Sequence, residues 1–431
     1  MIYKSDDFYK IEQFVFASEN ELKNIFTERS NKVYLKLKHI LDVFKDEKLS
    51  SSHFQQSTGV GYGDISREKI DSIFAKLFFA DKAAVRMQFV SGTHAISSVL
   101  FGILRPGDTM ISLTGSPYDT LEEVIGLRGE GYGSLTEFGI KYKQLDYIDD
   151  ESFFLKTKHL ITNTNCKLVF IQKSCGYSWK KSLTNMDIKK ICTFVHSIRP
   201  DCICFVDNCY GELVEDSEPI LNGANIIAGS LIKNLGGTIV PTGGYVVGDS
   251  NLVEMTCSRL TSPGIGSQGG VNFGLGRLIL QGLFLSPQMV SESLNCADLF
   301  ASVFSKLGFD VLPKAGSYRS DTIQAIQLKD PSLVQIVCQS FQSTSPVDSF
   351  LNVLPSPMNG YSSNLIMSGG TFVEGSTSEF SADGPLREPY NLFVQGGTHI
   401  SHAKIALIKL IFKLLKENLI EREFLNSFKY L

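Results

Sequence analysis

Short apolar runs alternate with amphipathic segments between residues 85 and 206, and this order restricts the fold more than any other feature of the sequence. The predicted strands are 86–90, 109–113, 167–171 and 203–206. Segments 95–104 and 188–198 repeat their apolar residues at helical spacing, and Thr184-Asn-Met-Asp187 predicts a capping box before the second segment. Strand, helix and strand in this order predict an α/β fold whose mostly parallel sheet is flanked by helices.

The chain of 431 residues is long enough for more than one domain, and three regions are predicted. Residues 1–80 form a helical arm, in which segment 1–50 is helical and a polar, glycine-rich loop spans 55–64. Residues 81–290 form the large domain with the sheet. Residues 291–431 form a small C-terminal α+β domain. Its predicted elements are a strand at 323–328, a helix at 331–342, strands near 365–367 and 391–394, and a last helix from about 400.

Charge and cysteine content exclude several classes of protein. The net charge of −4 argues against a protein that mainly binds nucleic acid or an anionic membrane. The nine cysteines have apolar neighbours and no C-x-x-C spacing, which predicts reduced core thiols and no structural metal. The charged N-terminus and the lack of a run of about 20 apolar residues predict a cytoplasmic protein with no membrane partner.

A lysine among apolar and small residues is the first candidate for chemistry. Lys233 lies in Ser230-Leu-Ile-Lys-Asn-Leu-Gly-Gly, and the predicted strand before it ends in Asp207. A pyridoxal phosphate (PLP) site needs a lysine for the Schiff base, a carboxylate for the ring nitrogen and a hydroxyl for the phosphate. These three residues fit that set. A lysine at a helix end and an aspartate that caps a strand explain the same pattern equally well.

Ser91-Gly-Thr-His94 is a candidate phosphate site, because it follows a predicted strand and opens a helix. Backbone amides at a helix N-terminus bind anions, and glycine allows close approach. An ordinary strand–helix turn explains this motif alone, but one phosphate accounts for both this turn and Ser230. No P-loop occurs, and the spacing of Gly59, Gly61 and Gly63 is wrong for a dinucleotide site.

Two further side-chain types are candidates for ligand contacts. Tyr118 follows the strand that ends near residue 113, where it can stack on a pyridine ring or simply close a turn. Arg387 lies in segment 381–390, a predicted loop of the small domain, and a guanidinium suits the carboxylate of an amino acid. Arg259 and Arg67 compete with it for that role, and a solvated surface position is the alternative for all three arginines.

Six long motifs together resemble one family. They are Ser91-Gly-Thr-His-Ala, Gly115-Ser-Pro-Tyr-Asp-Thr-Leu-Glu-Glu-Val-Ile-Gly126, Val206-Asp-Asn-Cys-Tyr-Gly-Glu212, Gly229-Ser-Leu-Ile-Lys-Asn234, Arg259-Leu-Thr-Ser-Pro-Gly-Ile-Gly266 and Phe380-Ser-Ala-Asp-Gly-Pro385. From about residue 54 to 400 the chain resembles the methionine γ-lyase-like family that is often labelled aluminium resistance protein. That family is a branch of the fold-type I PLP enzymes related to cystathionine lyases.

The resemblance implies a fold-type I PLP-transferase-like architecture, a cofactor on the large domain and an active site built at a dimer interface. It implies that Lys233 is the Schiff-base lysine, Asp207 the partner of the pyridine nitrogen and Tyr118 the stacking ring. The implied phosphate ligands are Gly92, Thr93 and Ser230, and Ser91 is a further candidate for binding the cofactor. In related lyases a Tyr-x-Arg pair of the neighbouring subunit also holds the phosphate, and Tyr62 and Arg67 are the candidates here, although they lie five residues apart.

The predicted function is that of a PLP-dependent carbon–sulfur lyase that acts by elimination on cystathionine, cysteine, methionine or a similar amino acid. Arg387 or Arg259 would bind the substrate, and the assembly would be a homodimer or homotetramer. The same apparatus serves aldolases and aminotransferases, and the motifs do not separate these activities. A non-catalytic protein that keeps the fold for ligand binding is the alternative from another class.

Overall fold

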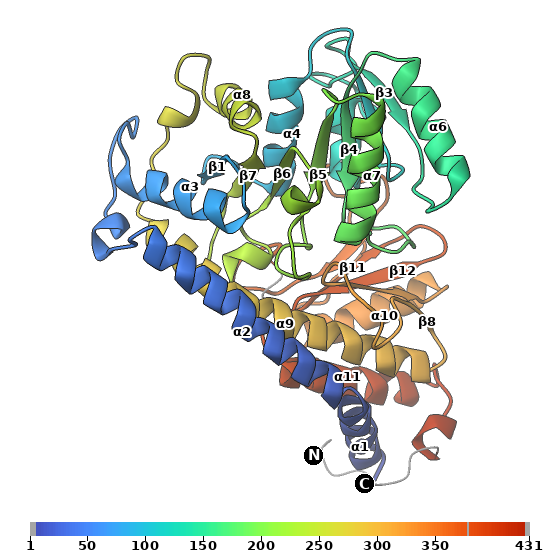
Figure 1. Ribbon diagram of the computed structural model, residues 1–431. Coiled ribbons are helices and arrows are strands. Elements are labelled where there is room, and N and C mark those ends of the chain that lie inside the picture. Colours follow the sequence, from blue (N-terminus) through green and yellow to red (C-terminus); the bar gives the residue numbers. More distant parts are fainter. Residues whose placement is uncertain (1–5, 377–378, 427–431) are drawn as a thin grey trace. The chain divides into compact units, whose positions relative to one another are not determined.

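The computed structural model describes residues 6–376 and 379–426, which fall into two compact units (Figure 1). We call residues 36–176 and 182–286 the central unit, and residues 1–35, 177–181 and 287–431 the terminal unit. The predicted helical segment 1–50 contains two helices, α1 (Asp6–Glu21) and α2 (Lys23–Asp46), and its first five residues lie outside the described part.

The central unit contains a seven-stranded sheet in the order β1-β7-β6-β5-β4-β2-β3. Its strands are β1 (Lys82–Arg86), β2 (Thr109–Ser112), β3 (Lys141–Gln144), β4 (Cys166–Gln172), β5 (Ile203–Asp207), β6 (Ile226–Ser230) and β7 (Gly244–Gly248). β6, β5, β4, β2 and β3 are parallel, and β7 is antiparallel to both of its neighbours. The predicted α/β fold with a mostly parallel sheet is therefore confirmed.

Helices pack against this sheet and against each other. The helices that lie wholly in the central unit are α3 (Ile65–Leu77), α4 (Gly92–Ile103), α5 (Asp119–Ile125), α6 (Glu151–Thr162), α7 (Asn185–Ile198) and α8 (Ser250–Leu260). α4 packs on β6, β7 and α8, while α3 packs on β1 and β7. The predicted capping box is present, because Thr184 and Asp187 exchange hydrogen bonds at the start of α7.

Two sequence predictions in this unit are wrong in detail. The strand expected at 86–90 is β1, which ends at Arg86, and α4 begins at Gly92 rather than at residue 95. The prediction extended the strand to Phe89 because this residue is apolar. Its buried side chain packs in the core from a turn and not from a strand. β3 was not predicted, because its mostly exposed Lys-Tyr-Lys-Gln sequence belongs to a polar edge strand and carries little apolar periodicity.

The terminal unit has its own five-stranded antiparallel sheet, in the order β10-β11-β12-β9-β8. The strands are β8 (Asp310–Leu312), β9 (Ile323–Gln327), β10 (Leu365–Ser368), β11 (Ser381–Pro385) and β12 (Asn391–Gln395). Its helices include α1 (Asp6–Glu21), α10 (Pro331–Gln342) and α11 (Ile400–Lys416). The small C-terminal sheet agrees with the predicted fold class, but residues 381–385, expected in a loop, form β11.

Two long helices belong to both units. The boundary between the two units falls after Leu35 in α2 (Lys23–Asp46) and before Pro287 in α9 (Gly276–Lys306). In the terminal unit, α1, α9 and α11 contribute to one apolar core that includes Phe14, Phe300 and Leu407. Among the helices that the structure describes, none is long and apolar enough to cross a membrane.

Candidate functional site

Three polar side chains mark the carboxyl ends of adjacent parallel strands. Gln172 ends β4, Asp207 ends β5 and Ser230 ends β6, and Gln172 lies beside Asp207 in the strand register. Side chains alternate between the two faces of a sheet, so these three share the face of Phe170, Phe205 and Ala228. Those apolar residues pack in the same core as α4. The polar residues therefore gather on the α4 face, at the edge where α/β folds bind ligands.

Asp207 is a buried carboxylate with few partners. Its Oδ1 accepts a hydrogen bond of 3.1 Å from the backbone N–H of Cys209. Burial raises the pKa of Asp207 to about 6, and the hydrogen bond from Cys209 opposes that shift. No basic side chain in the described residues forms an ion pair with it. Asp207 is thus suited to a ligand that brings a positive charge or a proton donor.

The turn before α4 lies directly against the end of β6. A Cβ placed on Gly92 would stand 3.1 Å from Cβ of Ser230 and 3.3 Å from Sγ of Cys209. Ser91 caps α4, because its Oγ accepts from the backbone N–H of His94 at 3.1 Å. The Oγ1 atoms of Thr93 and Thr120 lie 2.8 Å apart. The first amides of α4 and the hydroxyl of Ser230 therefore belong to one small region.

Lys233 comes shortly after Ser230 in the chain and is half-buried. Its Nζ lies 4.7 Å from the centre of the Tyr210 ring. The next residue, Asn234, donates through Nδ2 to the carbonyl oxygens of Tyr210 at 3.0 Å and Glu212 at 2.9 Å. The lysine segment and the segment after Asp207 are thus tied together.

Tyr118 is held at the same edge of the sheet. Its backbone N–H donates to Oε1 of Gln172 at 2.7 Å, and the Gln172 amide also donates to the carbonyl of Ser174. Because Gln172 neighbours Asp207 in the sheet, this bond brings the half-buried Tyr118 to the strand ends that carry Asp207. Stacking of the Tyr118 ring on a bound cofactor stays a prediction.

The arginine candidates have different surroundings. Arg259 is exposed at the end of α8, where its guanidinium carbon lies 5.3 Å from the centre of the Phe101 ring of α4. Burial, followed by the charge of Arg259, lowers the pKa of His94 at the start of α4. In the terminal unit, Arg387 donates to the carbonyl of Tyr177 and to Oγ of Ser362, both at 3.2 Å. Which arginine binds a substrate carboxylate stays a prediction.

Tyr62 and Arg67, predicted to act in a neighbouring subunit, differ sharply in exposure. The Tyr62 side chain is 62% exposed, whereas Arg67 is only 2% exposed. Nη1 of Arg67 donates to the carbonyls of Gly61 and Gly270, and Nη2 pairs with Glu68 at 3.3 Å. Arg67 therefore joins two loops of its own chain, and a role at a partner's phosphate stays a prediction for both residues.

Sequence reasoning overlooked Gln172, Tyr210, Glu212 and Asn234. Glu212 is buried, its Oε1 accepts from the hydroxyl of Tyr245 at 2.8 Å, and its Oε2 has no hydrogen-bond partner. Burial raises the pKa of Glu212 to about 8. In the sequence, Gln172 directly follows the predicted strand 167–171, and the other three residues lie close to Asp207 or Lys233. Polar residues that follow the carboxyl ends of parallel strands meet in space, and this was the signal.

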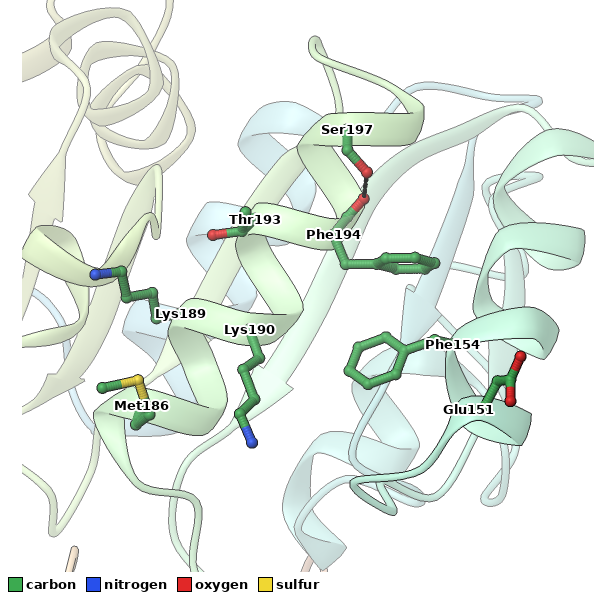
Figure 2. A pocket seen from close by; sticks show the side chains of 8 residues that line it. All are labelled: Glu151, Phe154, Met186, Lys189, Lys190, Thr193, Phe194 and Ser197. Atoms are coloured by element: carbon green, nitrogen blue, oxygen red, sulfur yellow. Dashed lines mark hydrogen bonds between the residues drawn. The ribbon is translucent and has the colours of Figure 1, made fainter.

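A separate pocket of about 730 Å³ lies between α6 and α7 (Figure 2). Phe154 and Phe194 meet edge to face in it, with ring centres 4.9 Å apart. The other lining residues are Glu151, Met186, Lys189, Lys190, Thr193 and Ser197. None of the predicted site residues lines this pocket, so it is distinct from the site at the strand ends.

The fold and the placement of these residues define the class. The α/β sheet with one antiparallel strand and the small antiparallel sheet form a PLP fold-type I architecture. The PLP-dependent protein YhfS of Escherichia coli shares this fold, with a TM-score of 0.59, 16% identity, and coverage of 88% of this chain and 96% of that one.

The model of the methionine gamma-lyase family matches residues 11–415, and the chain belongs to this family. The predicted family is thereby confirmed. The protein YnbB of Bacillus subtilis (strain 168) is 43% identical over 382 residues, which cover 88% of this chain and 91% of YnbB. The crystal structure of a carbon-sulfur lyase involved in aluminum resistance from Clostridium novyi NT has a TM-score of 0.89 and 42% identity, covering 94% of this chain and 96% of that one.

Proposed function

We propose that this chain is a PLP-dependent carbon–sulfur lyase that acts by elimination on a sulfur-containing amino acid. The observation that carries the proposal is the meeting of Asp207, Ser230 and Lys233 with the turn at Gly92 on one edge of the central sheet. The described activity of the Clostridium novyi relative, a carbon-sulfur lyase, supports the reaction class.

The residues present fit PLP by their chemistry. A phosphate suits the N-terminus of α4, where Gly92 leaves room that a Cβ would fill and where the hydroxyl of Ser230 is adjacent. A protonated ring nitrogen suits the Asp207 carboxyl, because an opposite charge offsets the cost of its burial. The amine of Lys233 lies on the same edge and can form a covalent bond with the cofactor aldehyde.

When bound, PLP supplies an electron-withdrawing ring that stabilises negative charge on the α-carbon of an amino acid. Asp207 would keep a proton on the ring nitrogen through its negative charge. Lys233 would hold the cofactor and, once its Nζ is free, take the proton from the substrate α-carbon. Tyr118 would keep the ring flat by stacking, and Arg387 or Arg259 would orient the substrate through its carboxylate.

We also propose that a second copy of the chain covers the loops beside this site. The side chains of four residues in these loops are each more than half exposed: Val60, Tyr62, Val90 and Phe273. Their loops adjoin, because Gly270 donates to the Val60 carbonyl at 2.9 Å and Gln88 donates to the Val271 carbonyl at 2.8 Å. Exposed apolar side chains of adjacent loops are typical of protein interfaces.

Sedimentation velocity tests the assembly. The wild-type chain is expected to sediment as a dimer or tetramer at micromolar concentration, and Phe273→Asp is expected to shift it toward the monomer. Tyr132→Asp is the matched control, since Tyr132 is also highly exposed but lies in another loop. A monomeric wild-type protein contradicts the proposed assembly.

The activity is tested by incubating the pure, PLP-loaded protein with a panel of amino acids and measuring thiol, ammonia and 2-oxo acid. A carbon–sulfur lyase releases an amino acid thiol from cystathionine, hydrogen sulfide from cysteine or methanethiol from methionine, in each case with ammonia and a 2-oxo acid. Lys233→Ala provides the background rate. Aldehyde release from β-hydroxy amino acids, or amino-group transfer without thiol release, would reassign the enzyme to an aldolase or an aminotransferase.

A further inference from the structure

The backbone of Tyr210 has an unusual conformation next to the proposed site. Its φ of +68° lies in the left-handed region, which is unfavourable for an L-residue with a Cβ. Glycine or asparagine adopts this conformation at lower cost. Strain of this kind persists where the surrounding structure enforces it, and it is concentrated at functional sites.

The ring of Tyr210 lies against the amine of Lys233. The distance from Nζ to the ring centre is 4.7 Å, within the range in which the negative face of an aromatic ring attracts a cation. The attraction acts on the ammonium form and is nearly absent for a neutral amine. The contact therefore favours the state in which Nζ carries a proton.

Hydrogen bonds hold both partners of this contact in place. Asn234, the neighbour of Lys233, donates to the Tyr210 carbonyl at 3.0 Å and to the Glu212 carbonyl at 2.9 Å. On the other side, the backbone N–H of Asn208 donates to the Ala228 carbonyl of β6 at 3.0 Å. The segment that carries Tyr210 is thus fastened to β6 and to the residue after the lysine, so the left-handed turn is part of a fixed framework.

We propose that Tyr210 is a positioning residue whose ring holds the ammonium form of Lys233. The inference rests on the proposed function, in which Lys233 carries the cofactor and later accepts the proton of the substrate α-carbon. The ring contributes to that step by stabilising the proton on Nζ after transfer. The left-handed turn at Tyr210 is the backbone conformation that presents the ring to the amine.

Other charged groups lie near Lys233. The charges of Asp207, Glu212 and Lys233 all act on the half-buried thiol of Cys209, so the three charged groups surround this thiol. Substitutions of Tyr210 leave these groups in place. A comparison among variants of Tyr210 therefore isolates the contribution of the ring.

The test is competitive acylation with acetic anhydride across a range of pH, followed by peptide mapping. It uses the full-length chain after any bound cofactor is removed by dialysis against hydroxylamine. The midpoint pH of Lys233 labelling is compared in wild type, Tyr210→Phe and Tyr210→Leu, with the exposed Lys143 as internal reference. Phe and Leu both carry a Cβ and both lack the tyrosine hydroxyl, so backbone strain is matched and the two variants differ in the aromatic ring.

The Lys233 midpoint is expected to match wild type in Tyr210→Phe and to fall by about 0.5 to 1.5 pH units in Tyr210→Leu, with Lys143 unchanged. Tyr210→Trp is expected to raise it, which provides a second reading if Tyr210→Leu does not fold. An unchanged midpoint in Tyr210→Leu or Tyr210→Trp, or an equal fall in Tyr210→Phe, overturns the proposal. Because no cofactor takes part, failure of this test is separate from failure of PLP to bind.

Discussion

Gly92 and Ser230, far apart in the sequence, face each other so closely that a Cβ on Gly92 would stand 3.1 Å from the Cβ of Ser230. This distance is tighter than an ordinary carbon–carbon contact, and the neighbouring Cys209 leaves little room for movement on the other side. The absence of a side chain at Gly92 therefore keeps the α4 N-terminus and the Ser230 hydroxyl within reach of one small anionic group.

Gly92→Ala is expected to lose about 1–3 kcal/mol of stability through overpacking against Ser230 and Cys209. It is also expected to bind PLP more weakly, because relief of this contact moves the N-terminus of α4 away from the Ser230 hydroxyl. Equilibrium titration with PLP, followed by absorbance, measures the change. Gly369→Ala is the matched control, since the closest atom to a Cβ there is 3.6 Å away. Equal PLP affinity in both variants argues against a phosphate at this turn.

Lys233 is expected to be the only residue that PLP modifies stably. Treatment of the yellow protein with sodium borohydride fixes the cofactor covalently, and peptide mapping should recover it on the peptide that contains Lys233. Lys233→Arg keeps the positive charge but has no amine that can react, so it should lose the label. A label on another lysine, or a protein that gains no absorbance with PLP, contradicts the assignment.

Asp207→Asn is expected to retain PLP but to lose about 10- to 100-fold in turnover on the best substrate, the effect of removing one charged interaction. A neutral amide does not stabilise a proton on the ring nitrogen. Steady-state kinetics measure the loss, and the absorption spectrum reports whether the cofactor stays bound. The exposed Asp201→Asn serves as control. Wild-type rates in Asp207→Asn would remove Asp207 as the ring partner.

Glu212 makes the stability of the cofactor-free protein depend on pH. Burial raises its pKa from 4.5 to about 8, so between these values the folded chain holds a proton that the unfolded chain has released. The stabilising effect is complete below pH 4.5 and is lost as the pH rises through 8. Asp207, with its pKa raised to about 6, acts in the same direction at lower pH.

Urea unfolding at pH 6.5 and 8.5 separates the effect of Glu212 from that of Asp207. Wild type is expected to lose on the order of 1–3 kcal/mol of unfolding free energy over this range, relative to Glu212→Gln, whose amide can still accept from Tyr245. Glu130→Gln, at an exposed position, should behave as wild type. A parallel pH dependence in wild type and Glu212→Gln would show that Glu212 is ionised throughout.

Arg387→Ala is expected to weaken amino acid binding about 10- to 100-fold without a change in the cofactor spectrum, because a hydrogen bond to a charged group contributes about 1.5–3 kcal/mol. Substrate-induced spectral changes measure the affinity. Arg259→Ala is the comparison, since Arg259 lies at the end of α8 in the central unit. Loss of affinity in Arg259→Ala alone would move the carboxylate-binding role to Arg259.

Local pattern was sufficient for the elements that have strong periodicity or clear ends. The strands that end in Gln172 and Asp207 and the capping box of α7 follow from short-range rules of alternation and capping, which act within a few residues. Segment 381–385 did not look like a strand, because small and polar residues form β11 only when β10 and β12 pair with it on both sides.

The sequence by itself determined the α/β class, the family and the candidates Asp207, Ser230 and Lys233, since motifs and periodicity are properties of neighbouring residues. Only the tertiary structure decided that Gly92 meets Ser230, that the Tyr210 ring lies against Lys233, and that Arg67 is buried among carbonyls of its own chain. The reason is physical: these contacts join segments distant in the chain, and their geometry depends on strand order and packing, which no local pattern encodes.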